Sequence, residues 1–170
     1  YSYNGSSFQQ VNTYITTPGG SQASVWGGDG ALVTDDNGNF YIMTGNGTFN
    51  ANTGGSDVGD SFVRLTAQLQ RQDYFTPFNQ SCLAGGDIDL GSGAPLLLTG
   101  ANVLIGGGKE GRAYVVSTTN MGQYTADPNL TCGSAEENRT DVDKVQQELP
   151  PGTAPSFSTP AFWNGPNGQY

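Results

Sequence analysis

The chain has 170 residues, of which 26 are glycine and 12% are charged, so its polarity comes mainly from Asn, Gln, Ser, Thr and Gly. This balance is typical of an all-β protein with many turns. The formal net charge of −9, with six basic residues, argues against nucleic acid and anionic membranes as partners, because a phosphate surface has to be met by clustered Lys and Arg. The sequence contains no pattern of a membrane span, signal peptide or coiled coil, which indicates a mature soluble chain or a piece of one.

Strand signals dominate the sequence as short aliphatic, aromatic or β-branched runs bounded by Gly, Asn, Asp or Pro. Strands are predicted at Phe40–Met43, Ser61–Leu65, Pro95–Leu98, Asn102–Gly106 and Arg112–Val116. The Asn-Gly pair within Asp35–Asn39 predicts a hairpin, and Lys109–Arg112 predicts a second tight turn. Asp35–Asn39 is a poor calcium loop, because the residues after it lack the remaining ligands.

One segment, Ser134–Leu149, has a helical pattern. Ser134 and Glu137 have the spacing of a capping box at its start. The Asn, Thr and Asp content of the segment disfavours a helix. We therefore expect at most a short helical turn before Val145–Leu149, which fits a strand equally well.

A repeated pattern is more informative about the fold. Gly30–Gly45, Gly93–Gly108 and Ser158–Tyr170 each pass from small residues or proline into a strand-like run, and the first two start 63 positions apart. Such a period, with several short strands per unit, predicts a β-propeller. Because propellers close a ring of about four to eight blades, roughly two and a half units predict a segment of a longer propeller. The predicted units span residues 24–85, 86–150 and, incompletely, 151–170.

Five Asn-X-Ser/Thr sequons and two cysteines indicate a secreted glycoprotein with N-linked glycans. The sequons begin at Asn4, Asn46, Asn79, Asn129 and Asn138. Some sequons arise by chance in a chain rich in Asn, Ser and Thr, so we expect one or two to be unused. Cys82 and Cys132 lie in turn-rich polar segments and predict a disulfide, either with each other or with cysteines outside this segment. The absence of His argues against a zinc site.

Three stretches in order, Phe40–Leu65, Asp87–Leu98 and Val103–Gly122, resemble the pyrroloquinoline-quinone-type propeller family, the superfamily of quinoprotein alcohol dehydrogenases. The most specific pieces are TGNG, GDSF and GKEGRAYVVS, and the resemblance spans roughly residues 24 to 165. It implies a ring of about eight blades, each a four-stranded antiparallel sheet, of which this chain would supply two to three. Because one fold hosts many functions, the resemblance is stronger evidence for the fold than for an activity.

The resemblance also implies a cofactor site. Asn46, in TGNGT, matches a calcium ligand of the family, and Asp60, in VGDSF, matches a residue that ligates or neighbours the calcium and acts as general base toward the alcohol. Lys109, in GKEG, matches a cation that reaches the quinone oxygens. Trp26 matches the floor under the quinone ring, although its spacing to Asn46 is a few residues longer than usual. Calcium prefers oxygen ligands, and a carboxylate can accept a proton as hydride moves to the quinone, so these residue types suit the chemistry.

Two departures argue against this site. Asn46 also begins a sequon, and an amide that carries a glycan cannot lie buried on calcium. Asp60 is followed by Ser where the family commonly has Asn. Each residue also has a purely structural explanation. Asp60 would cap a turn, and Asn46 would adopt a left-handed turn conformation. Lys109 would be a solvated turn residue, and Trp26 would pack between blades.

Two functions therefore remain open. The first is a secreted, N-glycosylated quinoprotein-like propeller without cofactor, which serves as an extracellular binding or scaffold module. The alternative is an oxidoreductase of alcohols or sugars that depends on calcium and pyrroloquinoline quinone. The expected partners are the remainder of the propeller or other copies of the chain, together with a small alcohol or carbohydrate ligand.

Overall fold

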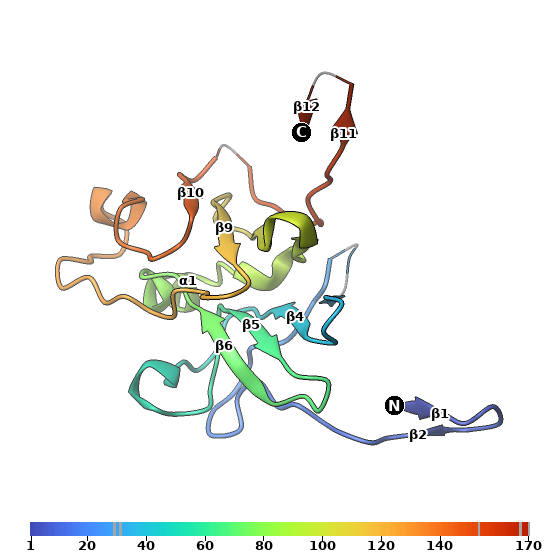
Figure 1. Cartoon of the computed structure of the whole chain (residues 1–170). Coiled ribbons are helices and arrows are strands. Elements are labelled where there is room, and N and C mark those ends of the chain that lie inside the picture. Colours follow the sequence, from blue (N-terminus) through green and yellow to red (C-terminus); the bar gives the residue numbers. More distant parts are fainter. Residues whose placement is uncertain (29, 31, 153, 167, 170) are drawn as a thin grey trace.

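The computed structural model of the chain describes residues 1–28, 30, 32–152, 154–166 and 168–169. These residues form two four-stranded antiparallel sheets and two two-stranded hairpins, connected by long loops and short helices (Figure 1). No helix among the described residues is long and apolar enough to cross a membrane. The predicted all-β character is confirmed.

The first four-stranded sheet has its strands in chain order. It contains β3 (Val33–Thr34), β4 (Phe40–Met43), β5 (Phe62–Leu65) and β6 (Arg71–Phe75). The predicted hairpin joins β3 to β4, where Gly38 has a φ of +77° and donates its N–H to the Asp35 carbonyl at 3.0 Å. The Asp35 carboxylate accepts hydrogen bonds from the backbone N–H groups of Asn37 and Asn39, so this acidic residue stabilises the turn.

The second four-stranded sheet repeats this arrangement. It contains β7 (Leu96–Leu98), β8 (Val103–Gly107), β9 (Ala113–Ser117) and β10 (Gln147–Leu149). The predicted tight turn between β8 and β9 is closed by a hydrogen bond of 2.9 Å from the Gly111 N–H to the Gly108 carbonyl. Each sheet lies within one of the predicted repeat units, 24–85 and 86–150, and neither sheet closes on itself in the described part of the chain.

Helical structure occurs only as short pieces among the described residues. The α-helix is α1 (Gln80–Gly86), and the 3-10 helices are η1 (Ala51–Thr53), η2 (Leu90–Ser92), η3 (Thr99–Ala101) and η4 (Ala135–Asn138). The sequence did not predict α1, whose two glycines disfavour a helix. Buried Leu83 and the disulfide of Cys82 hold it in place, and its C-cap Asp87 has a φ of +55° and donates its N–H to the Leu83 carbonyl.

The segment with a helical pattern, Ser134–Leu149, forms no long helix. Its start makes the 3-10 helix η4, with the Ser134 hydroxyl accepting from the Glu136 N–H. Its end, Gln147–Leu149, is strand β10. The expectation of at most a short helical turn is confirmed, and of the two alternatives left open for Val145–Leu149 the structure has the strand.

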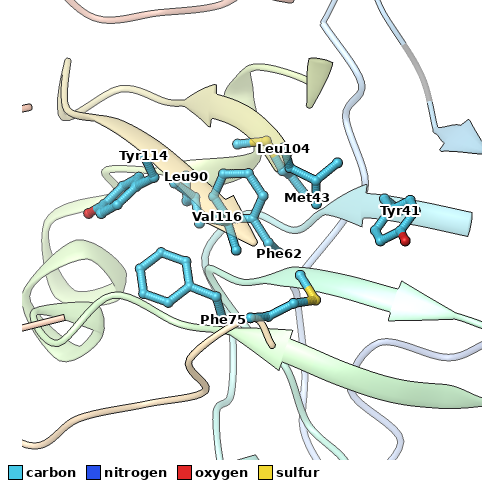
Figure 2. Packing of buried hydrophobic residues seen from close by; sticks show 9 residues of the cluster. Tyr41, Met43, Phe62, Phe75, Leu90, Leu104, Tyr114 and Val116 are labelled. Atoms are coloured by element: carbon cyan, nitrogen blue, oxygen red, sulfur yellow. The ribbon is translucent and has the colours of Figure 1, made fainter. Parts of the chain in front are cut away.

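A hydrophobic core fills the space between the two four-stranded sheets (Figure 2). Its buried members are Tyr41, Met43, Phe62, Phe75, Leu90, Leu104, Tyr114, Val116 and Met121. Ile42 and Val63 point to the opposite face of the first sheet and join a second cluster there, because successive residues of a strand alternate between faces. At Gly106 of β8 a Cβ atom would lie 2.7 Å from Met43 Sδ, so this glycine lets the two sheets approach closely.

Two small hairpins extend from the ends of the chain, away from the sheets (Figure 1). The first pairs β1 (Ser2–Tyr3) with β2 (Phe8–Gln9), and the last pairs β11 (Asn164–Gly165) with β12 (Gly168–Gln169). The incomplete third unit contains β11 and β12. Thr153, Asn167 and Tyr170 of that unit, like Asp29 and Ala31 before the first sheet, lie outside the described residues.

The disulfide joins Cys82 to Cys132, across 50 positions of sequence. The predicted disulfide is confirmed, with its two cysteines paired to each other. It ties α1, at the end of the first repeat unit, to the long loop between β9 and β10 of the second unit.

Candidate functional site

The glycine-rich loop between β4 and β5 brings Asn46 close to Asp60. The loop closes near its base, where the Thr44 hydroxyl accepts from the Ser61 N–H and the Asp60 N–H donates to the Gly45 carbonyl, both at 2.9 Å. A Cβ atom on Gly59 would overlap the carbonyl oxygen of the residue after Asn46. The two arms of the loop can therefore touch only because glycine is present.

Asn46 lies at the centre of the site and is 7% exposed. Its backbone N–H donates to Asp89 Oδ1 at 2.8 Å, and its side-chain Nδ2 donates to Asp87 Oδ1 at 3.2 Å. Its side-chain oxygen Oδ1 is buried and has no hydrogen-bond partner among the described residues. A buried acceptor without a donor costs free energy, so this oxygen is available to a ligand.

Asp60 lies deeper than Asn46 and has no exposed surface. Its Oδ1 accepts from the Leu90 N–H at 3.1 Å, and its Oδ2 accepts from Gln80 Nε2 at a long 3.4 Å. Burial raises the pKa of Asp60 to about 7, and the charge of Asp89 adds to this shift, while the hydrogen bonds from Leu90 and Gln80 oppose it. Asp60 is therefore a carboxyl group that changes its protonation near neutral pH.

Lys109 supplies the positive charge of the site. Its Nζ lies 2.6 Å from Asp89 Oδ2, 3.1 Å from the Asp87 carbonyl oxygen and 3.5 Å from Asp87 Oδ2. The hydrogen bond to Asp89 is the main reason why the pKa of Lys109 is raised. The ammonium also lies 5.0 Å from the ring centre of Trp26, which is 51% exposed, so a flat aromatic surface beside a cation is open to a ligand.

The structure thus brings together the four predicted site residues Trp26, Asn46, Asp60 and Lys109 in one polar cluster. Sequence reasoning missed the residues that join them, which are Gln80, Asp87, Asp89 and Leu90. The Asp-Ile-Asp pattern at residues 87–89 was a usable signal, since it places two carboxylates two positions apart at the start of the second repeat unit.

An open depression of about 490 Å³ lies beside Lys109. Its lining includes Asp87, Ile88, Glu110, Pro151 and Phe157. The depression therefore offers room for a small ligand next to the cluster.

The five sequons divide into two groups. Asn46 and Asn79 are buried, and their Nδ2 atoms donate to Asp87 and, at 2.8 Å, to Glu110. The sequons that are exposed begin at Asn4, Asn129 and Asn138. An N-linked glycan is bulky and is attached to Nδ2. Burial of Asn46 and Asn79 therefore argues against a glycan at either one in the folded chain.

The cluster is rich in oxygen atoms but is not a complete metal site. Among the described residues, no group of three or more His, Cys, Asp or Glu side chains is arranged to hold a metal ion. Calcium takes six to eight oxygen ligands in proteins. From this cluster it would receive the free Asn46 Oδ1, and the remaining ligands would come from a cofactor or from other residues.

Comparison of the chain with models of protein families, with curated proteins and with solved structures found no match.

Proposed function

We propose that this chain is part of a quinoprotein-like β-propeller that binds a planar quinone cofactor and oxidises alcohols or sugars. The observation that carries the proposal is the meeting of Trp26, Asn46, Asp60 and Lys109 in one cluster, as the resemblance of the sequence implied. Buried Asn46 also argues against a glycan at the one position where a sugar would exclude the site.

The propeller part of the proposal is supported by the two sheets. Each has four antiparallel strands in chain order, each falls within one repeat unit, and the two pack face to face through a shared core. Four-stranded antiparallel sheets packed against each other are what neighbouring blades of a propeller would require, so the two sheets support this part of the proposal.

The residues present fit pyrroloquinoline quinone, which is flat and carries carboxylates. The half-exposed face of Trp26 suits the ring system, and the Lys109 ammonium suits its negative charge. Asn46 Oδ1 is a hard oxygen ligand of the type that calcium prefers. When bound, the quinone would supply the redox chemistry by accepting two electrons from the alcohol.

The chain itself would position the cofactor and hold the proton. Lys109 would orient a quinone oxygen through its ammonium, which Asp87 and Asp89 keep in place. Asp60 would accept the alcohol proton, because its pKa of about 7 leaves it partly ionised at neutral pH. Asp89 is the competing candidate for this role, since it is also buried but contacts Lys109 directly at the edge of the cluster, whereas Asp60 has no exposed surface.

Tryptophan fluorescence tests the proposal. Addition of the quinone and calcium to the chain should quench Trp26, so quenching should be lost in Trp26→Phe and kept in Trp163→Phe, whose exposed ring is outside the cluster. Dye-linked alcohol oxidation in wild type, Asp60→Asn and Asp89→Asn then assigns the base. Equal rates in wild type and Asp60→Asn would remove Asp60 from that role, and absence of quenching in the wild type would contradict the proposal.

A second candidate function is a cofactor-free binding or scaffold module. It is favoured by the pairing already present in the cluster, where both oxygens of Asp60 and of Asp89 accept hydrogen bonds from the protein. Calorimetric binding of alcohols or sugars by the chain without quinone, together with no quenching, would favour this function over the first.

We propose an extracellular location for either function. The Cys82–Cys132 disulfide and the exposed sequons at Asn4, Asn129 and Asn138 support it, because disulfides persist in oxidising compartments. Secretion of the chain from eukaryotic cells with N-linked sugars attached would test this location.

A further inference from the structure

The short helix α1 contacts the cluster from both of its ends. At its first residue, Gln80 is 8% exposed and its Nε2 donates to the Gly47 carbonyl at 3.1 Å and to Asp60 Oδ2 at 3.4 Å. At its C-cap, Asp87 accepts from Asn46 Nδ2 and from Lys109 Nζ. α1 and its C-cap therefore contact three side chains of the cluster, which are Asp60, Asn46 and Lys109.

The Gln80 amide bridges the two arms of the glycine-rich loop. Gly47 follows Asn46 on the first arm, and Asp60 lies on the second arm. Because one donor group holds both arms, Gln80 fixes the position of the Asp60 carboxylate relative to Asn46. Asp60 in turn accepts from the Leu90 N–H, so the same bridge extends to η2.

The middle of α1 is anchored to the second repeat unit. Cys82 is bonded to Cys132, which lies in the loop between β9 and β10. That loop is held by the buried guanidinium of Arg112, which donates to the carbonyl oxygens of Glu137 and Arg139 at 2.8 Å each. The disulfide therefore connects α1 to a loop that is itself fixed to the start of β9.

We propose that α1 sets the geometry of the cluster, with Gln80 as the positioning residue for Asp60 and the Cys82–Cys132 disulfide as the anchor of the helix. The ligand affinity of the cluster then depends on an intact disulfide, whose second cysteine lies 50 positions after Cys82 in the sequence. This inference rests on the proposed function for the identity of the ligand, but its geometric part concerns the free chain.

Amide hydrogen exchange of the ligand-free chain, followed by NMR, tests the geometric part. In Gln80→Met, which keeps the length of the side chain but removes the donor, the Leu90 and Asn46 amides should exchange roughly two- to tenfold faster, as expected for loss of one hydrogen bond. Exposed Gln68→Met is the matched control and should leave both amides unchanged. The amides of β8 should not respond to either substitution.

The anchor is tested with Cys82→Ser/Cys132→Ser in the same measurement. Faster exchange at Leu90 and Asn46 is expected, whereas faster exchange confined to the loop between β9 and β10 would overturn the role of the disulfide. Unchanged Leu90 and Asn46 amides in Gln80→Met would overturn the role of Gln80.

Titration with pyrroloquinoline quinone and calcium separates this inference from the proposed function. If the wild type binds the quinone, its dissociation constant should rise roughly two- to tenfold in Gln80→Met and remain unchanged in Gln68→Met. Equal affinity of wild type and Gln80→Met would overturn the inference alone. Failure of the wild type to bind would contradict the proposed function, while the exchange rates would still decide the role of α1.

Discussion

Lys109 Nζ lies 2.6 Å from Asp89 Oδ2, which joins the turn after β8 to the N-cap residue of η2. The Lys109 side chain is 22% exposed and that of Asp89 is 6% exposed, so the ion pair lies at the edge of the cluster. The same Asp89 carboxylate accepts from the Asn46 N–H, which makes it the link between the cation and the glycine-rich loop.

Removal of the Lys109 ammonium should destabilise the fold. Lys109→Met leaves the buried Asp89 carboxylate without its charged donor, which should lower the free energy of unfolding. Urea denaturation measures this change. Exposed Lys144→Met is the control and should have an effect below about 0.5 kcal/mol, and equal stability of the two variants would show that the ion pair is not stabilising.

Stability should fall as pH rises from about 4 to about 8. Burial, with a smaller contribution from the charge of Glu148, raises the pKa of Asp143 to about 8. Burial raises that of Asp60 to about 7. An acid with a raised pKa in the folded state keeps its proton there while the unfolded chain has lost it, so folding is favoured below the unfolded pKa and disfavoured as pH rises to the folded pKa.

Thermal denaturation across this pH range checks the assignment of Asp143. In Asp143→Asn the decrease of Tm with pH should become shallower, because the Asn side-chain oxygen can still accept from the Phe78 N–H without titrating. Asp36→Asn, on the exposed turn before β4, should retain the wild-type slope. An unchanged slope in Asp143→Asn would refute the contribution of this residue.

Only the exposed sequons should carry glycans. When the chain is secreted from a eukaryotic host, we expect N-linked sugars at Asn129, Asn138 and Asn4, and none at Asn46 or Asn79. Mass spectrometry of tryptic peptides before and after enzymatic deglycosylation identifies the occupied sites. A sugar on Asn46 would contradict both the buried position of its amide and the quinone site.

Two glycine substitutions should have opposite effects. In Gly59→Ala the added methyl group would overlap the Gly47 carbonyl oxygen, which should cost about 1–3 kcal/mol and displace the glycine-rich loop. In Gly85→Ala the methyl group meets no atom within 4 Å, so better helix propensity should stabilise the chain by up to about 1 kcal/mol. Chemical denaturation of both variants measures the difference, and a destabilised Gly85→Ala would show that α1 does not tolerate a side chain there.

Much of the sheet structure could be predicted from local patterns. β4 and β8 are aliphatic or aromatic runs between turn residues, so composition alone predicts them. β6 was missed because Arg71–Phe75 begins with three polar residues, and its pairing with β5 compensates for their weak strand preference. α1 was missed because its stability comes from the disulfide of Cys82 and the burial of Leu83 rather than from the helix propensity of its residues.

The candidate site was predictable only in part, because the sequence contains its short motifs but does not show its tertiary contacts. Asn46, Asp60 and Lys109 lie in short motifs that resemble a known family, so each could be named from the sequence. Gln80 lies in no such motif, and its contact with Asp60 depends on how α1 packs against the glycine-rich loop. Burial of the Asn46 sequon could not be predicted either, because the Asn-X-Ser/Thr motif is the same whether the asparagine is exposed or buried.

The Cys82–Cys132 disulfide affects the unfolding of the repeats as well as the site. Repeat units that meet only through a shared core can in principle come apart one after another. Here the disulfide joins the first unit to the second and closes a loop across 50 positions. In the loop-entropy account, this loop lowers the conformational entropy of the unfolded chain and so raises its free energy by about 4 kcal/mol. A pulling force applied across the two sheets would therefore be borne partly by sulfur, and the two units cannot be drawn fully apart until that bond is reduced.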